Sequence, residues 1–217
     1  MFIGHHAAAF ASKRLAPEVS LGTLFAAAMW LDLLWPLMLL AGLERVAIDP
    51  GNTAFTPLDF LHYPYTHSLL LVLGWSVLGA LIYRIAGRGT WRGATVVALA
   101  VLSHWVLDFV THRPDLPLWP GGPRVGLGLW NSIPGTVVVE VLLFVLALGI
   151  YLRMTTARDR IGTIALWALV VFVSLIYVAN MMSPPPPDPK AIAWVALAAW
   201  LFVPWGAWID SHRQRRT

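Results

Sequence analysis

The chain has 217 residues, of which 58% are hydrophobic and only 12% are charged. A soluble domain carries about a quarter charged residues, so the composition excludes that class and predicts an all-α, polytopic integral membrane protein. The absence of cysteine excludes disulfides and thiolate metal sites. The net charge of +4 comes from short loops between apolar segments, which is typical of topology signals and not of a nucleic-acid-binding face.

The first predicted element is a short apolar segment over residues 1–11, interrupted by His5 and His6 and followed by Lys13 and Arg14. It is too short to span a bilayer. It can re-enter the membrane as a half helix packed against protein, which would bring His5 toward the first span. The alternative is an amphipathic helix that lies on the membrane surface.

Six later segments are long enough to cross about 30 Å of hydrocarbon as helices. They are separated by turn-rich sequences such as Asp49-Pro50-Gly51-Asn52. The predicted spans are residues 21–43, 67–85, 93–112, 134–153, 162–182 and 190–209. We expect one membrane domain, in which residues 1–133 form the half that carries the site and residues 134–217 form a scaffold.

The basic residues predict the orientation of these spans. One side of the predicted topology collects Lys13, Arg14, Arg84, Arg88, Arg92, Arg153, Arg158, Arg160, Arg213, Arg215 and Arg216, and the other has Arg45, Arg113, Arg124 and Lys190. Because basic loops stay in the cytoplasm, this alternation predicts a multi-pass membrane protein with both termini in the cytoplasm.

Ionisable side chains at membrane depth are costly and usually mark a functional site. His104, Asp108 and His112 recur at four-residue spacing, which places them on one face of a helix. At the helical rise, His104 and Asp32 both lie about 17 Å from the cytoplasmic edge. His67 opens the second span from the opposite side, so several segments converge between the midplane and the outer face.

Imidazole and carboxylate donors suit zinc, or another divalent ion such as manganese. The candidate metal ligands are His5, Asp32, His62, His67, His104, Asp108 and His112. More than four ligands would allow two ions, which can clamp a phosphoester or activate water. Glu140 in the fourth span is the candidate general base, because a partly buried carboxylate there can accept a proton, and Asp32 is the second catalytic candidate.

Residues around this set suggest supporting roles. Arg113 and Arg124 are candidates for holding a substrate phosphate. Asp59 and Asp115 are either solvated or capping residues, or they orient a ligand histidine. Pro36 cannot donate to the carbonyl of residue 32, which predicts a kink beside Asp32. That kink either frees the carbonyl for a cation, or is a packing kink with Asp32 bonded to a neighbouring helix.

Two segments, together with Gly4-His5 and Asp32, carry a resemblance to a known family over about residues 4–120. They are His62-Tyr-Pro-Tyr-Thr66-His67-Ser68-Leu69 and Ser103-His104-Trp-Val-Leu-Asp108-Phe-Val-Thr111. This pattern resembles the bacterial membrane-bound metal-dependent hydrolases, and the resemblance implies a location in the bacterial inner membrane. That family is a distant relative of zinc-dependent phospholipase C and of single-strand nucleases, so the resemblance implies zinc-assisted hydrolysis of a phosphoester.

The leading hypothesis is therefore a metal-dependent hydrolase of a lipid-linked or amphiphilic ester, with a phosphoester favoured, in the outer half of the bilayer. Its expected partners are membrane lipids and an amphiphilic small molecule, with no nucleic acid. One alternative is a transporter that conducts protons or metal ions through the same polar column. The other is a structural membrane protein whose metal fixes the helix bundle.

Overall fold

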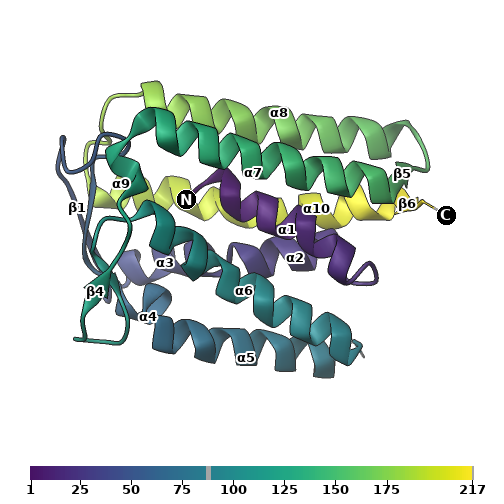
Figure 1. The fold of residues 1–217 in the computed structure, drawn as a ribbon, viewed down its shortest axis with the longest axis horizontal. Coiled ribbons are helices and arrows are strands. Elements are labelled where there is room, and N and C mark those ends of the chain that lie inside the picture. The colour runs from purple at the N-terminus through teal and green to yellow at the C-terminus, as the bar shows by residue number, and fades with distance from the viewer. Residues whose placement is uncertain (87–88, 217) are drawn as a thin grey trace.

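The computed structural model describes residues 1–86 and 89–216, so Arg88 of the predicted basic set lies outside the described residues. Within them the chain is a helix bundle with three short antiparallel strand pairs at its ends (Figure 1). The elements are α1 (Ile3–Leu15), α2 (Leu21–Ala28), α3 (Trp30–Leu40), β1 (Arg45–Ile48), β2 (Leu58–His62), α4 (Pro64–His67), α5 (Leu69–Ala86), α6 (Trp91–Thr111), β3 (Leu116–Pro117), β4 (Arg124–Val125), η1 (Leu129–Asn131), α7 (Ile133–Met154), β5 (Thr155–Ala157), α8 (Arg160–Met182), α9 (Pro189–Ala196), η2 (Leu197–Leu201), α10 (Phe202–Ser211) and β6 (Arg213–Arg215).

In the described ranges, five helical segments are long and apolar enough to cross a membrane: α5, α6, α7, α8 and the continuous run Pro189–Ser211. The bent pair α2–α3 makes a sixth when it is counted as one span. Large apolar side chains such as Leu70, Val77 and Leu175 are exposed on the outside of the bundle, where lipid tails would cover them. The prediction of an all-α polytopic membrane protein is confirmed.

The first helix, α1, lies inside the bundle, against α2, α6 and α7 (Figure 1). Phe10 is 1% exposed, and its ring centroid lies 5.1 Å from that of Tyr151 and 5.3 Å from that of Phe25. At the end of α1, the Lys13 ammonium donates to Asp210 at 2.7 Å. An amphipathic helix on the membrane surface would keep a polar face in water. The packing of α1 therefore fits the other alternative, a half helix packed against protein.

The first predicted span is broken at Met29, where α2 and α3 meet at 54°. The kink is expected beside Asp32, and the observed break lies three residues before it, while α3 continues through Pro36. At the break, α2 contacts α6: the Ala28 carbonyl, at the end of α2, accepts a hydrogen bond from His104 Nδ1 at 2.8 Å. Asp32 consequently lies in the first turn of α3.

A close contact between α2 and α10 holds the broken span in place. A Cβ atom added to Gly22 would lie 2.5 Å from the Val203 carbonyl oxygen and 2.8 Å from the Ala207 amide nitrogen. Small residues let helices approach closely in membrane proteins. Both of these neighbours are backbone atoms, which cannot move aside as a flexible side chain can.

We expect Gly22→Ala to lower the free energy of unfolding by about 1–3 kcal/mol, the usual cost of overpacking. Thermal unfolding of the protein in detergent measures this loss. Gly74→Ala is the matched control, because a Cβ at Gly74 would meet nothing within 4 Å. Equal stability of the two variants would contradict the close packing of α2 on α10.

Candidate metal site

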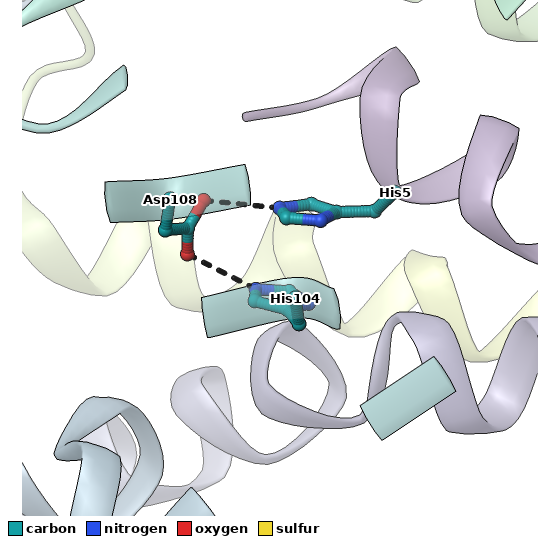
Figure 2. Close-up of side chains that lie close together, drawn as sticks. All are labelled: His5, His104 and Asp108. Atoms are coloured by element: carbon teal, nitrogen blue, oxygen red, sulfur yellow. Dashed lines mark hydrogen bonds and ion pairs between the residues drawn. The ribbon is translucent and has the colours of Figure 1, made fainter. Parts of the chain in front are cut away.

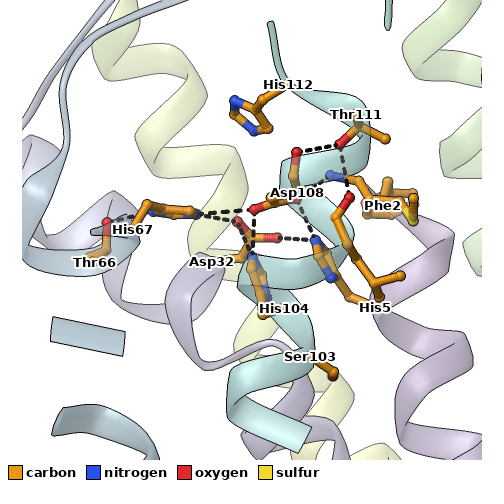
Figure 3. A network of polar contacts seen from close by, with 12 residues as sticks. Phe2, His5, Asp32, Thr66, His67, Ser103, His104, Asp108, Thr111 and His112 are labelled. Atoms are coloured by element: carbon orange, nitrogen blue, oxygen red, sulfur yellow. Dashed lines mark hydrogen bonds and ion pairs between the residues drawn. The ribbon is translucent and has the colours of Figure 1, made fainter. Parts of the chain in front are cut away.

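Side chains from α1, α3, α4 and α6 meet in the interior of the bundle (Figure 3). They are His5, Asp32, His67, His104 and Asp108. The three histidines and Asp108 are at most 3% exposed, whereas the Asp32 side chain is 36% exposed. The site therefore has one ligand candidate that remains accessible, and the sequence prediction that distant segments converge here is supported by the geometry.

Asp108 lies at the centre of this cluster. Its Oδ1 is 3.1 Å from His5 Nε2, and its Oδ2 is 3.2 Å from His104 Nε2 (Figure 2). His67 Nε2 lies 3.6 Å from Oδ2. The imidazole rings of His5 and His104 are stacked with centroids 3.6 Å apart, so that both Nε2 atoms face the same carboxylate.

Asp32 closes the cluster from the side of the broken helix. Its Oδ1 is 3.6 Å from His104 Nε2 and 3.7 Å from His67 Nε2. Two groups of ligand atoms result, His5–His104–Asp108 and Asp32–His67–His104, each within 4.8 Å. Ligand atoms that share a tetrahedral zinc ion with bonds of about 2.0–2.1 Å lie about 3.3 Å apart. The spacing therefore fits one ion. A second ion would need the carboxylates of Asp32 and Asp108 as shared ligands, because the single lone pair of His104 Nε2 can bind only one ion.

The tautomer of His104 supports this fit. Because the Ala28 carbonyl can only accept, His104 Nδ1 must carry the proton that it donates. The Nε2 of a neutral ring then presents a lone pair to two carboxylates, and it has no hydrogen-bond partner among the described residues. Such facing acceptors repel each other unless a proton or a metal ion lies between them.

The orientation of His67 is fixed by a chain of two further residues. The Thr66 hydroxyl donates its one proton to Glu44 Oε2 at 2.8 Å, so it accepts from His67 Nδ1 at 2.6 Å. This leaves His67 Nε2 free to bind a cation. Glu44 is 1% exposed and also accepts from the Thr66 amide at 2.9 Å. Sequence reasoning missed Glu44, which looks like an ordinary loop acid after the first span.

We expect Thr66→Val to weaken zinc binding about 10–100-fold, the usual effect of removing a group that orients a ligand histidine. A zinc titration of the apo protein against a competing chelator measures the change. Thr66→Ser should restore the affinity because it keeps the hydroxyl. Thr136→Val is the matched control, since this buried hydroxyl donates to the backbone carbonyls of Leu129 and Ser132; a similar loss there would contradict the role of Thr66.

His112 does not join the cluster, although the sequence places it in register with His104 and Asp108. The helix α6 ends at Thr111, and the backbone of His112 is extended, so its side chain leaves the helical face (Figure 3). Its Nδ1 lies 2.9 Å from Asp115 Oδ1 and 3.4 Å from the Tyr63 hydroxyl.

Burial lowers the pKa of His112, although the neighbouring Asp115 carboxylate acts in the opposite direction and raises it. Burial and Asp115 raise the pKa of Tyr63.

The other predicted site residues also lie outside the two ligand groups. His62 is in β2, with its ring 6.3 Å from that of Tyr65. Arg113 forms ion pairs with Asp59 and Asp115, so these two acids hold an arginine. Arg124 is exposed and donates to the Leu61 carbonyl at 2.8 Å. To bind a phosphate, Arg113 would have to release one of its two carboxylate partners, and Arg124 would have to use donors beyond the one that contacts Leu61.

Glu140 lies at the N-terminus of α1. Its Oε2 accepts from the amides of Phe2 at 2.9 Å and Gly4 at 3.2 Å. A carboxylate at this position satisfies free helix amides and the positive end of the helix dipole. The amine of Met1 donates to Asp108 at 2.6 Å in the same region. Glu140 therefore positions α1, and with it His5, whereas its role as a general base stays a prediction.

Comparison with known proteins places the chain in a family. No curated protein and no solved structure matches it. A family model described as YdjM inner membrane protein matches residues 2–185, a range that contains all five residues of the cluster. Since the match covers most of the chain, the protein belongs to the YdjM family of bacterial inner membrane proteins.

Proposed function

We propose that the cluster of His5, Asp32, His67, His104 and Asp108 binds a divalent metal, with zinc favoured over manganese. The proposal further holds that the protein is a hydrolase of a lipid-linked or amphiphilic ester, most naturally a phosphoester. The observation that carries it is the orientation of His67 and His104. Each uses Nδ1 in a hydrogen bond and directs Nε2 toward the carboxylates.

The chain's own residues have distinct roles in this proposal. A divalent ion held there supplies the Lewis acidity that polarises an ester oxygen and activates water. His5, His104 and Asp108 form the buried side of the site, which excludes bulk water. Asp32 is the most exposed member, so it is the carboxylate that can accept a proton from an entering water.

The orientation that the basic residues predict belongs to the same proposal. With Lys13, at the end of α1, and the β5–β6 pair on the cytoplasmic side, β1–β4 lie on the outer side, at the opposite end of the bundle (Figure 1). The predicted cytoplasmic N-terminus does not fit the fold, because the Met1 amine is buried inside the bundle against Asp108. Cysteines introduced at Asn52 and at Thr156 test this orientation with a membrane-impermeant thiol reagent in intact cells. Labelling at Asn52 without labelling at Thr156 is expected, and the reverse would overturn it.

Hydrolysis is tested with zinc-loaded protein in detergent. The two substrates are an aryl phosphodiester and a short-chain phosphatidic acid. We expect turnover that chelation abolishes and that His67→Ala removes. Glu140→Gln separates two roles: a general base would lose about 10²–10⁴-fold in kcat with the metal retained, whereas a helix-positioning residue would keep its turnover. Bound metal without turnover on either substrate would count against the phosphoester hydrolase.

The broken span favours a second candidate, a metal-ion transporter, because discontinuous helices beside a polar site are typical of transporters. The 54° break between α2 and α3 lies three residues before Asp32. Zinc uptake into proteoliposomes that contain a fluorescent chelator tests this function. Flux that disappears in His104→Ala would support transport. Metal binding with neither flux nor turnover would favour the structural role, in which the ion fixes the bundle.

A further inference from the structure

A second charged site lies at the other end of α1, away from the metal cluster. The Arg213 side chain is 7% exposed and donates to the Thr155 hydroxyl at 3.1 Å, the Gly162 carbonyl at 3.1 Å and the Thr155 carbonyl at 3.2 Å. All of these acceptors are neutral. The guanidinium therefore has hydrogen-bond acceptors, but none of these acceptors carries a negative charge that would balance its positive charge.

The nearby acids are already engaged with other cations. Asp210 is 2.7 Å from the Lys13 ammonium, and Asp159 is 2.7 Å from His212 Nδ1. Within residues 1–86 and 89–216, no carboxylate forms an ion pair with Arg213. Buried charges are normally paired, and among the described residues Arg213 has no carboxylate partner.

A cavity of about 200 Å³ borders this arginine. Its lining includes four basic side chains and one acidic side chain: Lys13, Arg158, Arg213, Arg215 and Asp210. Since Lys13 neutralises Asp210, the cavity retains three uncompensated positive charges. Arg158 and Arg215 are exposed, so their guanidinium groups are free to turn toward a ligand.

The position of the cavity fits the depth of lipid headgroups. Its lining includes residues from the ends of α7 and α10 and from the β5–β6 pair. These elements lie together at one end of the bundle (Figure 1). Thr155 and Met154 also line the cavity, so it is built at the end of a span. Cytoplasmic leaflets carry anionic lipids, and basic pockets at span ends bind their headgroups.

We infer that this cavity binds a phosphate group, through Arg213 at its base and Arg158 and Arg215 at its rim. Guanidinium groups bind phosphate oxygens in a bidentate manner. The phosphate of an anionic lipid headgroup and free inorganic phosphate share this chemistry. The site is separate from the metal cluster, because His5 and Lys13 lie eight residues and so about 12 Å apart along α1.

The test is native mass spectrometry of the full chain, delipidated in detergent and supplied with phosphatidylglycerol, phosphatidylcholine or inorganic phosphate. The test variant is Arg158→Gln/Arg215→Gln, which changes two exposed side chains and leaves buried Arg213 in place. The control is Arg153→Gln/Arg160→Gln, which removes the same charge from exposed residues outside the cavity lining.

We expect the wild type to retain one phosphatidylglycerol, the test variant to bind it at least tenfold more weakly, and the control to match the wild type. Retention of phosphatidylglycerol alone assigns the site to a lipid headgroup, and equal retention of inorganic phosphate assigns it to the free anion. The inference is overturned if both variants lose binding equally, which would indicate general charge attraction, or if the wild type retains neither ligand.

Discussion

Zinc should stabilise the folded protein, and a His104→Ala variant should lose this stabilisation. His104 is the residue that the two ligand groups share, and its Nε2 faces both carboxylates. A ligand that binds only the folded state at about 1,000 times its Kd adds about 4 kcal/mol to the free energy of unfolding. We expect this gain in the wild type and nearly none in the variant, as measured by unfolding in detergent with and without zinc.

His112→Ala is the control for this prediction. His112 is buried and follows the same helix, but it pairs with Asp115 and lies outside both ligand groups. The His112→Ala variant should be less stable than the wild type without zinc, but zinc should raise its free energy of unfolding by the same amount. A gain in His104→Ala as large as in the wild type would show that zinc binds elsewhere.

The second large effect is expected at Glu140. In Glu140→Leu, the part-buried amide of Phe2 and the buried amide of Gly4 lose their acceptor. An unsatisfied buried donor costs about 1–3 kcal/mol and a part-buried one costs less, so the two together cost at most about 6 kcal/mol. Because α1 carries His5, the zinc affinity should fall with the stability. Hydrogen exchange of the α1 amides, compared with the free energy of unfolding, measures whether the loss begins at this helix.

Glu140→Gln provides the matched control for the helix-positioning role, because its amide oxygen can still accept from the backbone. It should retain most of the stability and the slow exchange of α1. If Glu140→Leu exchanged its α1 amides as slowly as the wild type, the carboxylate would not be holding this helix.

The helices that cross the membrane could be predicted from the sequence because each is a long apolar run with turn-forming residues at its ends. His5, Asp32, His67, His104 and Asp108 could be predicted as one site for a related reason. Charged and imidazole groups are costly within apolar segments, so they are conspicuous there. The alternation of basic loops predicts a direction for each span, and with that direction the helical rise predicts similar depths for these groups.

The remaining features depend on contacts that a linear pattern does not contain. His112 fits the spacing of the helical face, but α6 ends one residue earlier. The break in the first span follows the contact of Ala28 with His104 and not the proline at residue 36. Glu44 reaches the site through Thr66, a partner 22 residues away. Each outcome is decided by tertiary packing, which local sequence cannot specify.

The most direct test of the metal site is the metal content of the detergent-purified protein, determined by elemental analysis. The wild type should hold about one or two equivalents of zinc or manganese, since the ligand set fits one ion or two. A folded His104→Ala/Asp108→Ala variant should hold none, and His112→Ala should match the wild type. If the wild type holds no metal even after reconstitution with divalent ions, the account of this cluster as a metal site is contradicted.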